Sequence, residues 1–118
     1  MQTKIHGIRH CDTMKRARAW LDEHGVSYDF HDYKVAGIDR ATLERWCRAV
    51  GWETLLNRSG TTFRKLPESE REELDEGRAI ALMLAQPSMI KRPVLTLGAR
   101  ILVGFRPETY AAELATRA

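Results

Sequence analysis

The chain has 118 residues, of which 43% are hydrophobic and 30% are charged, and its formal net charge is +3 at pH 7. These totals are ordinary for one soluble globular domain, and they lack the dense basic stripe of a nucleic-acid-binding protein. No segment approaches membrane-spanning length, and residues 1–4 lead into the fold without the apolar run of a signal peptide. We therefore expect a cytoplasmic protein with neither nucleic-acid nor membrane partners.

The first third of the chain predicts a strand–helix–strand unit. Residues 2–8 resemble a buried strand, and a helix is expected over residues 12–24, ending at Gly25. Residues 26–31 alternate between apolar and polar side chains, as a second strand would. Such units, of about 30 residues, usually place their two strands parallel. Cys11 would then lie where the helix begins, and unpaired N–H groups and the helix dipole favour the thiolate there.

The middle third of the chain, about residues 39–86, is predicted to be helical and inserted between sheet elements. Asp39 can cap a helix that ends at Gly51. A short element and a polar loop over residues 57–62 follow. Another helix should begin at Pro67, with acidic residues in its N-terminal half, and run to Ala85. The first of these helices has a core-facing stripe made of Leu43, Trp46, Cys47 and Val50.

The last part of the chain predicts a hairpin and a final helix. Two strands, at residues 94–97 and 100–103, are joined by Gly98-Ala99, with glycine first as a type II′ turn prefers. Pro107 can start the last helix. The expected order is strand, helix, strand, a group of helices, two strands and a helix.

Cys11 can be read as a reactive thiolate or as a small buried residue at a strand–helix junction. We favour the thiolate because Cys11 stands at a predicted helix N-terminus with Arg9 and His10 beside it. We interpret His10 itself as a loop residue rather than as a proton shuttle. Met14 removes any C-x-x-C pair, so another thiol would have to resolve a mixed disulfide. Cys47 is expected to be an inert core thiol, and no metal-ligand spacing is present.

Four segments, in this order and spacing, resemble the arsenate reductase (ArsC)-like family, most of all its YffB branch, a sibling of the Spx regulators. They are His-Cys-Asp-Thr at 10–13, Asn-Arg-Ser-Gly-Thr-Thr-Phe-Arg-Lys-Leu at 57–66, Gln-Pro-Ser-Met-Ile-Lys-Arg-Pro at 86–93 and Gly-Phe-Arg-Pro at 104–107. The resemblance covers nearly the whole chain. It implies an α/β, thioredoxin-like fold with a four-stranded mixed sheet, as one domain over residues 1–118 with the helical insertion at about 39–86.

The resemblance also implies site residues. In arsenate reductases a cysteine thiolate attacks the oxyanion and arginines hold it. Cys11 matches that nucleophile, Arg92 matches the arginine before a proline, and Arg106 matches the arginine before the final helix. Guanidinium groups suit bidentate binding of carboxylates and oxyanions, and they would lower the pKa of Cys11.

Four further residues are expected to bind the substrate or the thiol. Asn57 stands where arsenate reductases carry an arginine, and Arg58 follows it. Pro93 matches the cis-proline of thioredoxin-like folds, which would present backbone to a thiol-bearing ligand. Thr13 can serve the helix start as a cap or donate a hydrogen bond to the Cys11 thiolate.

The YffB branch implies a small cytoplasmic oxidoreductase, a glutathione-dependent thiol reductase without a tightly bound cofactor. Glutathione or another small thiol would be the co-substrate, and a glutaredoxin-like protein could be a further partner. Arsenate reduction is one alternative. A second is an Spx-like regulator that contacts RNA polymerase, although Met14 replaces the second cysteine of the usual Spx sensor pair.

Overall fold

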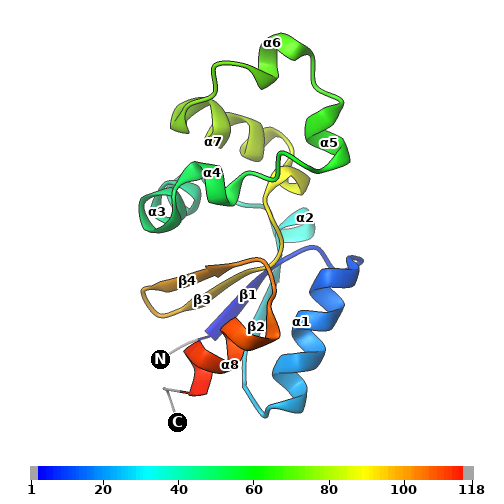
Figure 1. Cartoon of the computed structure of the whole chain (residues 1–118), viewed down its shortest axis with the longest axis vertical. Coiled ribbons are helices and arrows are strands. Elements are labelled where there is room, and N and C mark those ends of the chain that lie inside the picture. Colours follow the sequence, from blue (N-terminus) through cyan, green and yellow to red (C-terminus); the bar gives the residue numbers. More distant parts are fainter. Residues whose placement is uncertain (1–2, 116–118) are drawn as a thin grey trace. The chain divides into compact units, whose positions relative to one another are not determined.

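The computed structural model describes residues 3–115 (Figure 1). The chain divides into two compact units. Unit 1 contains the described residues up to Asp32 and those from Arg92 onward, and unit 2 contains Tyr33–Lys91. The residues of the predicted insertion, 39–86, all lie within unit 2. No helix among residues 3–115 combines the length and apolar character needed to cross a membrane.

Unit 1 is built on a four-stranded mixed sheet with the order β2-β1-β3-β4. β1 (Thr3–Gly7) is parallel to β2 (Asp29–Asp32), and β3 (Val94–Leu97) is antiparallel to both β1 and β4 (Arg100–Val103). The predicted α/β, thioredoxin-like architecture with a mixed sheet of four strands is therefore confirmed.

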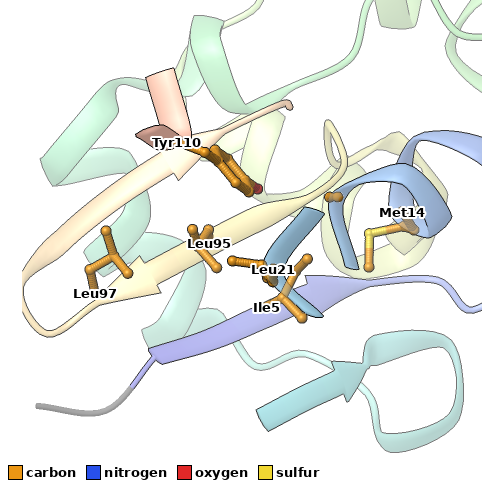
Figure 2. Close-up of a cluster of buried hydrophobic side chains, with 7 residues drawn as sticks. Ile5, Met14, Leu21, Leu95, Leu97 and Tyr110 are labelled. Atoms are coloured by element: carbon orange, nitrogen blue, oxygen red, sulfur yellow. The ribbon is translucent and has the colours of Figure 1, made fainter. Parts of the chain in front are cut away.

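One face of this sheet is covered by α1 (Asp12–Glu23) and α8 (Pro107–Ala115). Ile5 pairs with Leu95, so their side chains share that face, as Figure 2 shows. Leu21 from α1 and Tyr110 from α8 are fully buried against them. Burying side chains of this size contributes about 1.5–3 kcal/mol each, and this cluster anchors α1, the helix that begins beside Cys11. The buried members are Ile5, Met14, Ala17, Leu21, Leu95, Leu97 and Tyr110.

β2 begins three residues later than the alternating pattern predicts. Gly25, with φ 67°, follows α1, and its N–H donates to Asp22 O at 3.2 Å. The N–H of Val26 donates to Leu21 O at 2.9 Å. These two bonds form a Schellman motif that ends α1, so Val26 serves the helix end and pairing with β1 starts only at Asp29.

The C-terminal half of unit 1 matches the prediction residue for residue at β3, β4 and the start of α8. Gly98 has φ 63°, which is compatible with the expected type II′ turn. An ion pair of 2.8 Å between Arg100 and Glu113 joins β4 to α8.

Unit 2 is helical, and its longest helix is α3. Asp39 caps α3 by accepting a hydrogen bond of 2.8 Å from the N–H of Thr42, as the sequence predicts, and Gly51 ends it with φ 87°. An isolated bridge pairs Leu56 with Ile90. The helices are α2 (Tyr33–Ala36), α3 (Arg40–Val50), α4 (Trp52–Leu55), α5 (Thr61–Arg64), α6 (Glu68–Arg71), α7 (Glu76–Ala85) and the 3₁₀ turn η1 (Pro87–Met89).

Two predictions for unit 2 need correction. The helix expected from Pro67 to Ala85 is two helices, because Glu73 adopts the left-handed region with φ 52° and Asp75 then caps α7. The Asp75 carboxylate accepts from the N–H of Arg78 at 2.8 Å. The polar loop expected over residues 57–62 is shorter, since α5 begins at Thr61.

Candidate active site around Cys11

The strand directions of unit 1 bring three predicted site residues to one edge of its sheet. Cys11 follows β1, Arg92 precedes β3 and Arg106 follows β4. Because β3 runs antiparallel to β1 and β4, the ends of β1 and β4 and the start of β3 meet at that edge. A hydrogen bond of 2.8 Å from Gly104 N–H to Pro93 O joins the two loops there.

Cys11 is the N-cap residue of α1. Its backbone is extended, with φ −137° and ψ 129°, and its carbonyl accepts the first helical hydrogen bond from Lys15 N–H at 2.9 Å. Cys11 makes no side-chain capping hydrogen bond of the usual geometry, but its half-buried sulfur, a weak acceptor, interacts with the backbone N–H groups of Met14 and Thr13. The sulfur thus lies near the place that a serine or aspartate oxygen usually has at a helix start.

The environment of Cys11 lowers the pKa of its thiol. Burial is the largest influence and raises the pKa, since it disfavours the charged form. The hydrogen bond from Met14 N–H, the hydrogen bond and charge of the Arg92 guanidinium, and the bond from Thr13 N–H together outweigh burial. A larger fraction of thiolate is therefore present near neutral pH than in an ordinary cysteine, and the thiolate is the form that attacks electrophiles.

Gly7 and Met14 fit together just behind Cys11. A Cβ on Gly7 would overlap the Met14 sulfur and come within 2.7 Å of Met14 Cε. Met14 has no exposed surface, so its side chain has little room to move away. The absence of a side chain at Gly7 therefore lets Met14 pack in the core and hold the first turn of α1 against β1.

The other predicted site residues of unit 1 lie around this edge. The Arg92–Pro93 peptide bond is cis, as the resemblance implies, and Arg92 is half-buried. Thr13 contacts the thiol through its backbone N–H. Arg106 is exposed and lines a pocket of about 150 Å³ between the end of β4 and the first turn of α8. The roles of Pro93 and Arg106 in binding stay predictions.

Asn57 and Arg58 belong to unit 2. The Asn57 side chain accepts a hydrogen bond of 3.2 Å from Ser59 N–H, and its backbone N–H donates to Met89 O at 2.8 Å. The Arg58 guanidinium lies 5.7 Å from the centre of the Trp52 ring. Their predicted part in thiol binding stays a prediction.

Cys47 differs from Cys11 in its exposure and in the pKa of its thiol. It is 4% exposed on α3, and burial, followed by the charges of Glu76, Glu44 and Glu53, raises the pKa of its thiol to about 11. Both cysteines are free thiols. Among the residues described, no three His, Cys, Asp or Glu side chains gather as a metal site would need.

The structure also groups side chains that sequence patterns did not bring together. Arg9 and Arg18 both lie over the ring of Phe30, with Cζ 5.7 Å and 4.3 Å from the ring centre. Arg18 Nε donates to the hydroxyl of Tyr28 at 3.4 Å. The spacing of Arg18 from Cys11 could have placed both on one face of α1, but it carries no signal for the contact with Phe30.

The chain was compared with known proteins, and residues 6–113 match the ArsC family. A protein of Haemophilus influenzae, named only as uncharacterized, is 36% identical over 111 residues, which is 94% of this chain and 97% of the relative. The global transcriptional regulator Spx of Streptococcus mutans is 27% identical over 106 residues, covering 88% of this chain and 77% of Spx.

Solved structures agree with these matches. A protein named YFFB superposes with a TM-score of 0.91 at 67% identity, covering 94% of this chain and 97% of its own. An arsenate reductase (ArsC) related protein from Brucella melitensis has a TM-score of 0.79 at 56% identity, covering 97% of this chain and 95% of its own. The chain belongs to the ArsC family and, within that family, to the YffB branch.

Proposed function

We propose that this protein is a thiol-dependent reductase in which Cys11 is the single nucleophile and glutathione, or another small thiol, is the co-substrate. The observation that carries the proposal is the Cys11 thiol, which accepts hydrogen bonds from Met14 N–H, Thr13 N–H and Arg92 and has a lowered pKa. Cys11 has the partial exposure that a reacting sulfur needs. We expect the protein to act in the cytoplasm, where thiols are kept reduced.

The reaction begins when the Cys11 thiolate attacks one sulfur of a substrate disulfide. The substrate S–S bond breaks, a new S–S bond forms to Cys11, and the departing thiolate takes a proton from water. In the second step a glutathione thiolate attacks the mixed disulfide and Cys11 leaves as a thiolate. The groups that lower the pKa of Cys11 stabilise it as a leaving group, so they assist this second step as well.

An external thiol is needed because Cys11 has no partner in its own motif. Met14 occupies the position of the second cysteine in a C-x-x-C pair and is fully buried in the core. Arg106, exposed at the same sheet edge, suits a carboxylate of a glutathione-like thiol through a bidentate pair. In this proposal Thr13 and Arg92 hold the reacting sulfur, while Pro93 and Arg106 border the bound thiol.

Mass spectrometry of the protein incubated with oxidised glutathione tests this function. We expect a single glutathione adduct, located on Cys11, which persists in Cys47→Ala and is lost in Cys11→Ser. Added reduced glutathione should remove the adduct. An unmodified protein, or an adduct that resides on Cys47, would show that Cys11 is not the activated thiol.

Arsenate reduction is a second candidate, because the Brucella melitensis relative at 56% identity is described as arsenate reductase related. The same thiolate would attack the arsenic atom, an As–O bond would break with its oxygen leaving as water, and Arg92 would offset the charge of the oxyanion. External thiols would then supply the two electrons that reduce As(V) to As(III) and would themselves be oxidised to a disulfide. A glutaredoxin-coupled assay with arsenate distinguishes this candidate. Arsenate-dependent turnover that needs Cys11 would establish it, and its absence alongside glutathione adduct formation would leave the thiol reductase.

A regulatory role is the third candidate, since the relative from Streptococcus mutans is the global transcriptional regulator Spx. A pull-down with the alpha subunit of RNA polymerase tests it. If the Cys11→Ser protein binds the subunit as well as the native protein does, and Cys11 forms no glutathione adduct, regulation replaces catalysis as the function.

A further inference from the structure

Beside the reactive cysteine lies a cluster of two arginines on one aromatic ring, defined here as the Arg9–Phe30–Arg18 cluster. Arg9 lies in the turn before Cys11, Arg18 lies two turns along α1, and Phe30 is in the edge strand β2. The Cζ atoms of the arginines are 5.7 Å and 4.3 Å from the centre of the ring. Both distances lie within the range of a cation–π contact, about 6 Å.

Lys15 extends this cluster into a positive stripe that leads to the sulfur. Cys11, Lys15 and Arg18 are spaced i, i+4 and i+7, so they lie on one face of α1. At 1.5 Å of rise per residue, Lys15 is about 6 Å and Arg18 about 10 Å from Cys11 along the helix axis. The buried Met14 and Leu21 lie on the adjoining face of α1, so the stripe runs along the border of the buried face, with Lys15 exposed and Arg18 half-buried.

Among the residues described, 3–115, carboxylates form no ion pair with this stripe, since none of Arg9, Lys15 and Arg18 takes part in one. The Asp32 carboxylate accepts the backbone N–H of Arg9, at 3.4 Å, and Asp22 lies beyond Arg18 at the far end of the stripe. A guanidinium laid on a ring keeps its N–H edges available for a carboxylate, so the cluster presents two fixed cations ready for an anionic partner.

We infer that the positive stripe docks an acidic protein segment that delivers its own disulfide to Cys11. An extended chain advances about 3.3 Å per residue, so side chains two to four residues from the partner cysteine would reach Lys15 and Arg18. The partner is therefore a protein disulfide whose cysteine has Asp or Glu at those positions. A protein segment fits better than a nucleic acid, because the stripe ends at a sulfur that reacts with disulfides.

This inference rests on the proposed function, since it needs Cys11 to be the nucleophile. The Cys11 thiolate attacks the partner's disulfide, that S–S bond breaks, and a new S–S bond joins Cys11 to the partner peptide. The partner's other sulfur leaves as a thiolate and takes a proton from water. A small thiol then releases the peptide, with Cys11 returning to the thiolate.

Stopped-flow exchange with three peptide disulfides tests the docking step. The peptides carry Glu, Gln or Lys at the second and third positions from cysteine and are otherwise identical. We expect the Glu peptide to react about tenfold faster than the Gln peptide at low salt, with the advantage falling as salt is raised. The Lys peptide should be the slowest. Thermal melts followed by circular dichroism establish that each protein variant used in this test is folded.

Variants locate the effect on the stripe. The Glu-to-Gln rate ratio should fall several-fold in Arg9→Gln/Arg18→Gln, to about one when Lys15→Gln is added, and be largely retained in Arg18→Lys. Arg16→Gln is the matched control, because Arg16 is an exposed arginine of α1 that lies off the stripe. This variant loses one arginine charge, half of the loss in the double variant, and its ratio should stay near that of the native protein because the lost charge lies off the stripe.

The failure of this inference is distinguishable from failure of the proposed function. A neutral disulfide, 4,4′-dithiodipyridine, reports the reactivity of Cys11 alone in Cys47→Ala. Rapid reaction with this reagent but equal rates for the Glu and Gln peptides would overturn the docking inference only. The inference is also wrong if those rates are equal while a DNA oligonucleotide binds the native protein and not Arg9→Gln/Arg18→Gln. If Cys11 does not react with the neutral disulfide, both the docking inference and the proposed thiol reductase function are wrong.

Discussion

Substitution of Gly7 by alanine should destabilise the protein because the added methyl group would clash with the side chain of Met14. The new Cβ would overlap the Met14 sulfur and lie 2.7 Å from Met14 Cε. Met14 is fully buried, so either its side chain leaves a preferred rotamer or β1 and α1 separate slightly. Inserting a methyl group into a packed core costs about 1–3 kcal/mol, and we expect Gly7→Ala to lower the free energy of unfolding by that amount.

Urea denaturation of four proteins measures the cost and assigns it to Met14. Met14→Ala alone should cost about 2–5 kcal/mol, since it leaves a cavity. In the double variant the two changes compensate, so the total should be about 1–2 kcal/mol smaller than the sum of the single effects. The first turn of α1 supplies the N–H groups that hold the Cys11 thiol, so the pKa of Cys11 should rise in Gly7→Ala.

Gly77→Ala is the matched control for this experiment. A Cβ at Gly77 would meet only Asp75 Oδ1 at 3.6 Å, an ordinary contact, and Gly77 lies within α7. Alanine in a helix is favoured over glycine by up to about 1 kcal/mol, so this variant should be neutral or more stable. If Gly7→Ala behaves like Gly77→Ala, or if the Gly7 and Met14 effects simply add, the overlap does not control the stability of this region.

Three further predictions follow from buried or capping groups. In the folded protein, Cys47 should resist alkylation up to a pH near its pKa of about 11. Unfolding the protein in urea should make Cys47 accessible to the reagent, whereas fast labelling in the folded protein would contradict its burial. Burial, then the charges of His31 and Lys4, lowers the pKa of His6 to about 4. The unfolded chain therefore binds the proton first, and the protein should lose about 2–3 kcal/mol of stability as pH falls from about 6.5 to 4. In His6→Gln this part of the pH dependence should vanish, and an unchanged slope in pH-dependent urea unfolding would rule out His6 as its source. Asp75→Ala should cost about 1 kcal/mol in the same unfolding assay, because it removes the N-cap of α7; an unchanged midpoint would show that water replaces the cap.

Local chemistry was enough to predict some elements from the sequence. Gly98 and Ala99 form the turn of a hairpin, Pro107 starts α8, and Asp39 caps α3. Each of these features was predictable because it depends on residues within four positions along the chain. The prediction of β2 was wrong at its start, since alternation cannot show that the N–H of Val26 is used by the end of α1.

The site required information from far along the chain. Cys11 at a helix start was predictable from its neighbours, but its contact with Arg92 depends on the antiparallel pairing of β1 and β3, and the expectation of an arginine there came from the family resemblance. The contact of Arg9 and Arg18 with Phe30 depends on how α1 packs beside β2, and no periodicity in the sequence encodes that packing.

The pKa of Cys11, measured by pH-dependent alkylation in Cys47→Ala, tests the central claim most directly. The hydrogen bonds from Met14 N–H and Thr13 N–H and the charge of Arg92 predict a value clearly below the ordinary cysteine pKa of about 8.5. Arg92→Gln should raise that value, with its fold checked by circular dichroism. A pKa near 8.5 that does not change in Arg92→Gln would contradict an activated nucleophile at Cys11.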